Sequence, residues 1–442
     1  MNPNLRSRFL GLLLAFFFCF LGTSAVEGHS PMLPDELRMF QGQGAQIDLA
    51  IPVQAEVSVD RPDVVMLNNQ PNPSMKVSLG SPLKLSSLSS GEAKLRMKLF
   101  GQIPLKTVKV NVIPDLKVIP GGQTIGVKVK SDGILVVGHH LVNTEKAKMS
   151  PGEAAGIQPG DLITHLNGSH LKDVHEVASL VERAGKNNQP LNVIYKRNNQ
   201  RFSTTLTPAF DRQDKAWRLG LYIRDSAAGV GTLTFYAPNQ GVYGALGHVI
   251  TDMNTQTPIA VGSGQILQSS VTSISKSESG EPGEKRAHFV KEGKTLGTIE
   301  RNTHFGIFGK MTENPDHSVY KTPIPVAFSE EVKEGPAEIL TVVEGQQVER
   351  FKVEIAHVSK QSAPQTKGLV IRITDPRLVE KTGGIVQGMS GSPIIQNGKL
   401  IGAVTHVFVN DPRSGYGCFI EWMLQDAGIL KRDNASTNLK AS

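Results

Sequence analysis

The hexapeptide GMSGSP, residues 388–393, places a serine hydroxyl between two glycines, a pattern that suits a nucleophile. Hydrolysis of a peptide bond by serine needs an accessible hydroxyl, a nearby base, and hydrogen-bond donors for the oxyanion that forms. Gly388 and Gly391 let the backbone turn sharply without a β-carbon in the way. We therefore predict that Ser390 is the nucleophile and that the N–H groups of Gly388 and Ser390 bind the oxyanion. Ser392 is expected to be a structural turn residue.

The residues that follow this corner support the prediction. Asn397-Gly398 is a two-residue hairpin signal between two apolar runs. A G-x-S-G-x-P corner followed by a hairpin resembles the nucleophile corner of trypsin-like peptidases. The alternative from the motif alone is that Ser390 is an ordinary turn residue.

The base must come from the 12 histidines. His248 stands in GVYGALGHVITD, where three glycines permit the close approach of another backbone. His406, in GAVTHVFV, is expected to pack or hydrogen-bond within a strand. The histidines at 165, 170 and 175 cannot share one face, so no metal site is predicted there. His248 is therefore the candidate base, with a purely structural role as the alternative.

Three aspartates could orient the base. Asp375 ends the apolar run GLVIRITD, and Pro376 ends that strand because it lacks an N–H, which would hold the carboxylate at the rim of a sheet. Asp411 is in a similar position but also suits an Asx turn. Asp252 follows His248 by four residues and is expected to be tied to its own turn. We rank them in that order.

The composition and the N-terminus limit the class of protein. The chain has 442 residues and a net charge of +7, but no block of Lys and Arg with interleaved aromatics, so no nucleic-acid partner is predicted. Residues 1–26 carry Arg6 and Arg8, then the apolar run 9–22 and small residues, the order found in a secretory signal. The chain is expected to be exported. Whether this segment is removed or kept as a membrane anchor stays open.

The pattern along the chain predicts a mainly β protein with three domains. Residues 30–114 alternate apolar and polar positions between turn clusters, which predicts a small β-rich domain. Residues 116–210 form a second block with two helical patterns. Residues 211–442 are a series of short β-branched runs and turns, which predicts a barrel or sandwich.

The second block resembles a PDZ domain of the bacterial protease type. Its stretch SPGEAAGIQPGDLITHLNG contains a capped helix, a turn and a buried strand, and Asp173 opens a second helix. The upstream stretch PGGQTIGVKV resembles the loop and strand that capture a peptide C-terminus in that family. The predicted peptide-binding residues are Gly121, Gly122, Ile125, Gly126 and Val127.

The whole pattern closely resembles the stage IV sporulation protein B peptidase family. GALGHVITD, IRITDPRLVEKTGGIVQGMSGSPIIQNGKLIGAVTHVF and GYGCFIEWML carry this resemblance. It implies a trypsin-like double β-barrel, with His248 as the base, Asp375 as the acid and Ser390 as the nucleophile, and no metal or organic cofactor. One feature departs from ordinary trypsin-like chains, in which the acid belongs to the first barrel and lies far upstream of the nucleophile.

The resemblance also implies a biological role. Such a protein is exported across the inner forespore membrane into the space facing the mother cell. There it cleaves itself and a membrane-bound regulatory complex, which triggers the processing of pro-sigma-K by an intramembrane metalloprotease. The rival hypotheses are a non-catalytic PDZ adaptor and a signalling ligand with an inactive peptidase-like barrel.

Overall fold

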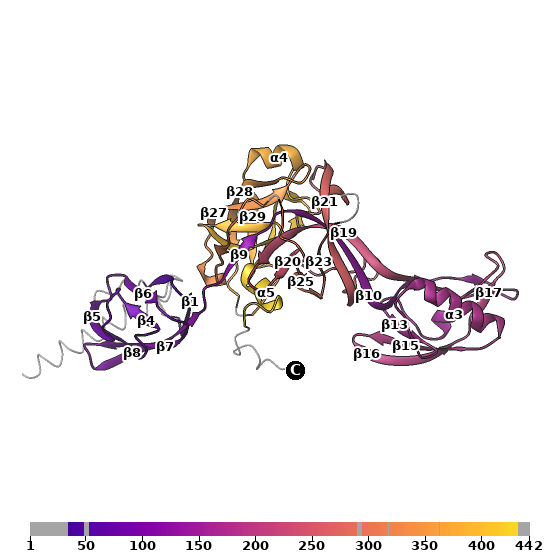
Figure 1. The fold of residues 1–442 in the computed structure, drawn as a ribbon, viewed down its shortest axis with the longest axis horizontal. Coiled ribbons are helices and arrows are strands. Elements are labelled where there is room, and N and C mark those ends of the chain that lie inside the picture. Colours follow the sequence, from indigo (N-terminus) through magenta and orange to yellow (C-terminus); the bar gives the residue numbers. More distant parts are fainter. Residues whose placement is uncertain (1–33, 48–52, 290–293, 317, 362, 432–442) are drawn as a thin grey trace, which may run out of the picture. The chain divides into compact units, whose positions relative to one another are not determined.

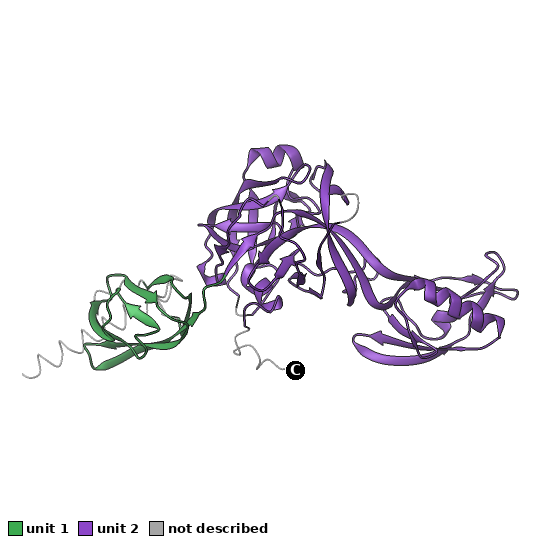
Figure 2. Cartoon of the chain, viewed as in Figure 1, with its two compact units in different colours: residues 1–116 green, residues 117–442 purple. Residues whose placement is uncertain are grey.

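The structure, a computed structural model, describes residues 34–47, 53–289, 294–316, 318–361 and 363–431. The chain divides into two compact units, residues 1–116 and 117–442 (Figure 2). The predicted export segment, residues 1–26, lies outside the described residues. Within those described ranges, no helix is long and apolar enough to cross a membrane.

The first unit is a small β domain with two sheets. One sheet has the order β1 (Glu36–Phe40), β8 (Ile103–Ile113), β7 (Gly91–Leu99), β3 (Gln54–Val59) and β5 (Ser74–Ser78). The other has the order β2 (Gly44–Ile47), β6 (Leu83–Ser87) and β4 (Val65–Leu67). Alternate residues of these strands are buried, as in β7, and they form one core around Val57, Leu85 and Leu95. The β-rich N-terminal domain expected from the sequence is present.

The second unit contains a half-barrel built largely on three long strands, β10 (Thr124–His139), β19 (Leu221–Ala237) and β21 (Val261–Ser275). β10 pairs with β19 on one side and with β21 on the other. The sheet continues through β9 (Lys117–Pro120), β20 (Val242–Ala245), β22 (Glu284–Phe289), β23 (Thr295–Thr298), β24 (Arg301–Thr303), β25 (Gly306–Lys310) and β26 (Ile324–Pro325). Its core includes Ile125, Leu233 and Tyr243.

A closed six-stranded barrel follows. Its order is β27 (Gly335–Val342), β28 (Val348–Val358), β29 (Leu369–Ile373), β32 (Asp411–Phe419), β31 (Lys399–Phe408) and β30 (Pro393–Gln396). The predicted hairpin joins β30 to β31, and Asn397 and Gly398 have the positive φ values, 51° and 74°, that a two-residue turn requires. The short η1 (Ser329–Glu331), α4 (Pro376–Thr382) and α5 (Ile420–Asp426) complete this part.

The PDZ part lies between β10 and β19 in the sequence. Its larger elements are α2 (Pro151–Ala154), β13 (Leu162–Leu166), α3 (Val174–Lys186), β15 (Leu191–Arg197) and β16 (Gln200–Leu206). Its short strands are β11 (Val142–Asn143), β12 (Lys148–Met149), β14 (Ser169–His170), β17 (Ala209–Asp211) and β18 (Ala216–Arg218). The side chains of Ser150 and Asp173 cap the two helices, as the sequence indicated.

Two strands belong to both the half-barrel and the PDZ part (Figure 1). Residues 124–130 of β10 pair with β19 and β21 in the half-barrel, whereas Ile134 and Leu135 pair with β13 of the PDZ part. The PDZ part is therefore an insertion within the half-barrel. This differs from the predicted division at residues 116–210, because residues 117–130 pair with strands of the half-barrel.

Candidate active site

The corner that carries Ser390 is a tight turn whose shape requires glycine. Gly388 and Gly391 both have φ of +93°. A β-carbon on Gly391 would lie 2.2 Å from the carbonyl oxygen of Thr232. Ser392 is fully buried, so its hydroxyl faces no substrate, in agreement with the predicted structural role.

β19 of the half-barrel holds this corner in place. The hydroxyl of Thr232 donates a hydrogen bond to the carbonyl oxygen of Gly388 at 2.8 Å, and the hydroxyl of Thr234 donates to that of Gly391 at 2.8 Å. The N–H of Thr232 donates to the carbonyl oxygen of Ser390 at 3.0 Å. Both threonines are fully buried. The corner that carries Ser390 belongs to the closed barrel, so these bonds join the half-barrel to the closed barrel at this corner.

The two predicted oxyanion donors are unoccupied. The N–H groups of Gly388 and Ser390 donate to no residue that the structure describes. In a tight turn around a nucleophile, unpaired N–H groups are the donors that a tetrahedral oxyanion needs. Both N–H groups are therefore available to an oxygen atom that carries negative charge.

The ring of His248 is oriented by a backbone carbonyl. Its Nδ1 lies 2.8 Å from the carbonyl oxygen of Val249, which can only accept, so Nδ1 carries the proton and Nε2 keeps a lone pair. Burial holds the pKa of His248 below its ordinary value, so the neutral ring is favoured. The hydroxyl of Ser390 donates to the carbonyl oxygen of Thr405 at 2.8 Å. In this arrangement the hydroxyl is therefore paired with a backbone carbonyl and has to turn to reach a base.

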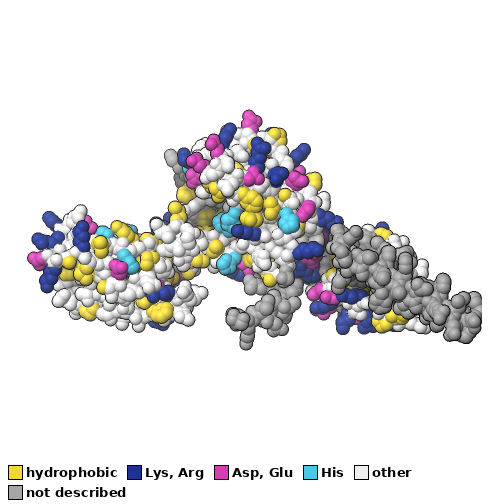
Figure 3. Space-filling view, turned by 180° about the vertical axis from the view of Figure 1, so that it is seen from behind, with side chains coloured by type: hydrophobic (Ala, Val, Ile, Leu, Met, Phe, Trp, Pro, Cys, Tyr) yellow, Lys and Arg dark blue, Asp and Glu magenta, His cyan; other side chains and the backbone are white. Residues whose placement is uncertain are grey.

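A cleft of about 910 Å³ brings these groups together. Ser390, Gly388 and His248 all line it, together with residues 226–230 of β19. Figure 3 shows histidine side chains on one face of the second unit, to which all the residues of the cleft belong. No group of three or more His, Cys, Asp and Glu residues suited to a metal ion occurs in the described parts of the chain.

His406 also lines the cleft, which the sequence did not indicate. Its ring centroid lies 5.3 Å from that of His248. Desolvation, together with the nearby His248 and Lys367, lowers the pKa of His406 to about 4. The pairing of β31 with β32 shifts register between Val404 and His406, and this irregularity breaks the simple alternation that the sequence suggested.

Asp375 does not hydrogen-bond to His248. Its carboxylate accepts bonds from the Nε and Nη2 groups of Arg377 and from the N–H groups of Arg377 and Lys352, at 2.9 to 3.2 Å. It is the N-cap of α4 and is buried. The guanidinium of Arg377 holds the pKa of Asp375 below its ordinary value. The carboxylate of Asp375 is therefore hydrogen-bonded to Arg377 and Lys352. The ring of His248 is hydrogen-bonded to the carbonyl oxygen of Val249.

The other two aspartates have different surroundings. Asp252 lines the cleft but forms an ion pair with Arg224 at 2.8 Å and accepts from the N–H groups of Asn254 and Thr255. It is tied to its own turn, as expected. Asp411 is exposed at the start of β32.

The residues predicted to capture a peptide in the PDZ part lie in the half-barrel instead. The N–H of Gly121 donates to the carbonyl oxygen of Thr234, and that of Gly122 donates to that of Leu233. Ile125 and Val127 are buried in the half-barrel core. Gly126 pairs with both neighbouring strands, and a β-carbon there would lie 2.0 Å from the ring of Phe289. These five residues therefore form no carboxylate site, because strand pairing and the core have taken their N–H groups and side chains.

Within the PDZ part, the apolar–glycine–apolar stretch that opens a strand is Leu219–Leu221. Leu219 and Leu221 belong to the same apolar cluster as Val177 and Val181 of α3. Gly220 has φ of +69°, which suits glycine. In the sequence, the stretch WRLGLYI could have identified Leu219–Leu221 as the apolar–glycine–apolar stretch of the PDZ part, in place of PGGQTIGVKV.

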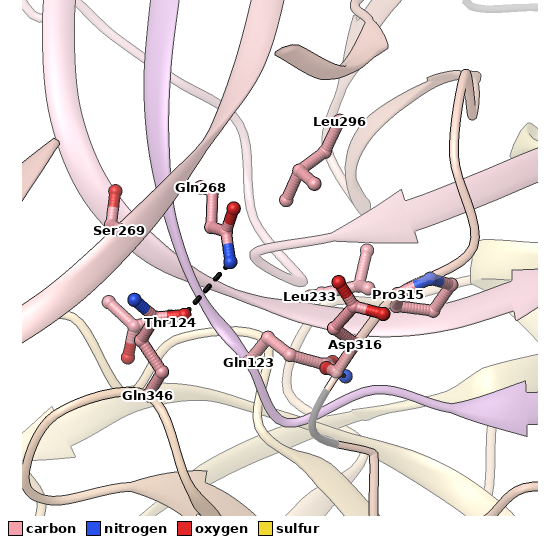
Figure 4. Close-up of a pocket in the computed structure, with 9 residues that line it drawn as sticks. All are labelled: Gln123, Thr124, Leu233, Gln268, Ser269, Leu296, Pro315, Asp316 and Gln346. Atoms are coloured by element: carbon pink, nitrogen blue, oxygen red, sulfur yellow. Dashed lines mark hydrogen bonds between the residues drawn. The ribbon is translucent and has the colours of Figure 1, made fainter. Parts of the chain in front are cut away.

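A second cavity lies between Gln123, Thr124 and Gln346 and has a volume of about 20 Å³ (Figure 4). The amide of Gln268 donates to that of Gln346 at 2.8 Å across its wall. This volume suits about one water molecule. It is therefore no candidate for a substrate site.

Comparisons with known proteins agree with the resemblance of the sequence motifs. Residues 215–424 match the family described as SpoIVB peptidase S55, and residues 146–196 match the PDZ domain. No curated protein matches the chain. The match to a peptidase family supports a serine peptidase, and the PDZ match supports a protein or peptide partner.

The solved structures to which parts of the chain are similar share little sequence with it. The PDZ domain of the SdrC-like protein from Listeria monocytogenes is 17% identical over 21% of this chain and 87% of its own, with a TM-score of 0.17. The active form of the Rv3671c protease from M. tuberculosis is 15% identical over 47% of this chain and 77% of its own, with a TM-score of 0.27. Its inactive form is 16% identical over 45% and 84%, with a TM-score of 0.25.

Proposed function

We propose that this chain, in which residues 215–424 match the SpoIVB peptidase S55 family, is a serine endopeptidase with Ser390 as its nucleophile. The observation that carries the proposal is the nucleophile corner itself. Ser390 stands on the wall of a large cleft, next to two N–H groups without partners among the described residues, and His248 lines the same cleft.

The chemistry follows from the roles of these groups. The hydroxyl of Ser390 rotates away from Thr405 and attacks the peptide carbonyl, while Nε2 of His248 accepts its proton. The N–H groups of Gly388 and Ser390 stabilise the oxyanion. The imidazolium then gives its proton to the leaving amine, and a water molecule releases the acyl group by the same steps in reverse order.

The carbonyl oxygen of Val249 holds the His248 ring in the required tautomer during these steps. This oxygen accepts a hydrogen bond from the Nδ1–H group, and its dipole stabilises the imidazolium. The resemblance assigns this role to Asp375. The activity of an Asp375→Asn variant decides between a triad with Asp375 and a pair in which a backbone carbonyl holds the ring of His248.

We further propose that the enzyme acts outside the compartment in which it is made. The charged and apolar order of residues 1–26 supports export or tethering to a membrane. The resemblance supports cleavage of itself and of a membrane-bound regulatory protein, leading to intramembrane processing of pro-sigma-K during endospore formation. The PDZ match supports a role in choosing these protein substrates.

A fluorophosphonate probe tests the catalytic part of the proposal. The wild-type chain and the Ser390→Ala and Ser392→Ala variants are labelled and mapped by mass spectrometry. We expect labelling at Ser390 in the wild type and in Ser392→Ala, and none in Ser390→Ala, because Ser392 is buried. The same spectra report self-cleavage. Absence of labelling in the wild-type chain would favour a PDZ adaptor with an inactive barrel.

A further inference from the structure

A tight turn in the first unit, green in Figure 2, carries an aromatic side chain at an unusual position. The turn joins β7 to β8, and its two central residues, Phe100 and Gly101, have φ of +51° and +74°. The N–H of Gln102 donates to the carbonyl oxygen of Leu99 at 3.1 Å and closes the turn. Positive φ suits glycine and asparagine, because in most other residues the β-carbon crowds the backbone. Turn formation therefore does not explain a phenylalanine here.

Other two-residue turns in the described parts of the chain begin with asparagine. Their central pairs, with positive φ at both positions, are Asn68-Asn69, Asn167-Gly168, Asn198-Asn199 and Asn397-Gly398. Packing does not explain the phenylalanine either, since Phe100 is 72% exposed. A side chain that neither its turn nor the core requires is a candidate for contact with a partner outside the chain.

Phe100 belongs to an exposed apolar tip, which we define as Phe100, Ile103 and Leu105. Ile103 is 58% exposed, and Leu105 is exposed as well. In the described part of the first unit, the other exposed large apolar side chain is Leu88, at 45%. Leu88 lies at the opposite end of the sheet, because its carbonyl oxygen accepts from the amide of Gln41, which follows β1. The apolar exposure of this domain is thus concentrated at one hairpin end.

Basic side chains stand beside the apolar tip. Lys98 lies just before the turn, and Lys76 lies at the same level two strands away, with Glu56 between them on β3. Both lysines are exposed, and neither forms an ion pair with a residue that the structure describes. Glu56 accepts a hydrogen bond from the hydroxyl of Ser74 at 2.9 Å. Two amines around one carboxylate leave an excess of positive charge, which favours an anionic surface.

The chain enters the first unit from the same end. β1 and β8 are parallel, with Glu36 beside Lys109, so the backbone before Glu36 leads back toward the end at which β8 begins. Asp35 continues this direction, since its carbonyl oxygen accepts from the N–H of Lys109. Its carboxylate also forms an ion pair with Lys106, which is four residues from the turn. The N-terminal side of the domain and the apolar tip therefore share one end of the sheet.

The apolar run 9–22 is within reach of this end. The segment from Gly22 to Glu36 can span up to about 50 Å when fully extended. The strand from Ile103 to Lys109, which separates the tip from the level of Glu36, spans about 20 Å. A membrane that contains the apolar run can therefore also touch the apolar tip. This reach favours a lipid surface over a soluble protein as the partner of the tip.

We infer that the apolar tip inserts into the surface of a membrane that contains anionic lipids. The side chains of Phe100 and Ile103 enter the boundary between headgroups and acyl chains, and the amines of Lys76 and Lys98 bind the lipid phosphates. This contact is separate from the catalytic cleft and does not require residues 1–26. A protein held at a membrane in this way meets membrane-bound proteins at a raised local concentration.

The test uses residues 27–442, which lack the predicted export segment and keep every residue that the structure describes. Binding is measured by sedimentation with vesicles of phosphatidylcholine, with and without about one third phosphatidylglycerol. We expect Phe100→Asn to weaken binding to the anionic vesicles by about tenfold or more. The matched control, Leu88→Asn, also removes an exposed apolar side chain and should stay within about twofold of the wild type. Equal losses for both variants would overturn the inference.

The same variant has a distinctive effect on stability. Asparagine suits the turn better than phenylalanine does, so we expect Phe100→Asn to unfold at the same temperature as the wild type or at a higher one. Weaker binding without a loss of stability is the signature of a side chain that is present for a partner. A variant that unfolds at a lower temperature would give Phe100 a structural role and contradict the inference.

The lysines test the charge of the surface. We expect Lys76→Gln and Lys98→Gln each to weaken binding to the anionic vesicles by about fivefold, and to leave the weaker binding to pure phosphatidylcholine unaltered. Raising the salt concentration should have the same effect as the substitutions. A wild-type chain that binds both kinds of vesicle equally would overturn the anionic surface as the partner.

A fluorescent label locates the contact. Residues 27–442 contain one cysteine, Cys418, which is fully buried, so a cysteine introduced at Gln102 or at Leu88 is the accessible one. We expect spin-labelled lipids to quench a dye on Gln102→Cys and not on Leu88→Cys. Quenching at Leu88→Cys alone, or equally at both positions, would overturn the inference. A wild-type chain that binds neither kind of vesicle would also overturn it and would favour a protein as the partner of the tip.

Discussion

The imidazole rings of His248 and His406 lie 5.3 Å apart between centroids, with their planes tilted by 43°. Both line the same cleft as Ser390, and the pKa of each is lowered from its ordinary value. At neutral pH the site therefore contains two uncharged rings. This relationship determines how the activity should respond to pH and to substitution.

The first prediction concerns the acid side of the pH profile. A base is lost when it is protonated, and burial of His248 disfavours its cation. We therefore expect the rate of phosphonate labelling to fall to half at a pH below about 6.5, the ordinary pKa of histidine. The measurement is the labelling rate between pH 4 and 8, with thermal unfolding recorded in parallel. A midpoint at or above the ordinary value would contradict the assigned environment of the base.

The second prediction separates the roles of the two rings. His248 has its Nδ1 fixed by Val249, so Nε2 is available as the base. We expect His248→Gln to lower kcat by about 10³-fold or more, and His406→Gln by less than about tenfold. Cleavage of casein by matched amounts of folded protein measures both. The opposite order would make His406 the base.

The third prediction tests Asp375. Its carboxylate is committed to Arg377 and to the N–H of Lys352. We expect Asp375→Asn to destabilise the fold by about 1–3 kcal/mol, because bonds to charged groups are weakened. Thermal unfolding measures this loss, and the labelling rate of the folded protein should fall far less than the about 10⁴-fold loss known for a triad acid. A stable variant with that larger loss would support the triad.

The fourth prediction concerns the support of the nucleophile corner. Thr232→Val removes the hydroxyl that donates to Gly388 and leaves a buried carbonyl without a partner, at a cost of about 1–3 kcal/mol. We expect a lower unfolding temperature and a lower kcat, with Thr232→Ser retaining most of both because it keeps the hydroxyl. KM should change little. If Thr232→Ser behaves like Thr232→Val, the methyl group and not the hydrogen bond is what matters.

The fifth prediction uses a buried lysine near the same corner. Lys285 is fully buried, its Nζ lies 3.0 Å from the hydroxyl of Thr341, and burial lowers its pKa to about 7. Between this value and the ordinary pKa of about 10.4, the unfolded chain binds a proton that the folded chain does not, so stability rises with pH. Lys285→Met should be more stable than the wild type at pH 7.

The advantage of Lys285→Met should shrink by about 1.4 kcal/mol for each pH unit up to pH 10. Denaturant unfolding of both proteins at several pH values measures the difference. A constant difference would mean that the amine keeps the same charge in the folded and unfolded chains.

The local features of the site were predictable from the sequence because local rules determine them. The glycines of the corner and the Asn397-Gly398 turn need backbone conformations that few other residues adopt, so their positions carry information. The helix caps of the PDZ part, Ser150 and Asp173, follow the same logic.

The features that were missed depend on pairing between distant segments. PGGQTIGV has the composition of a peptide-capturing loop, but β10 pairs with β19 and β21, which lie about a hundred residues or more further along the chain. No local pattern reports that pairing. His406 lies in β31, whose pairing with β32 shifts register between Val404 and His406. The alternation of apolar and polar residues in the sequence does not indicate this shift. The partners of Asp375 likewise depend on β28 lying beside β29.

The insertion of the PDZ part through two paired strands has a practical consequence for dissecting the chain. Lys130 and Ser226 face each other across β10 and β19, so the points where the module leaves and re-enters the half-barrel are cross-strand neighbours. A tight Asn-Gly turn joining them could replace everything in between. Truncation from either terminus, by contrast, would remove strands of the half-barrel or the closed barrel before it removed the PDZ part, so only excision from within can yield both barrels without the PDZ part.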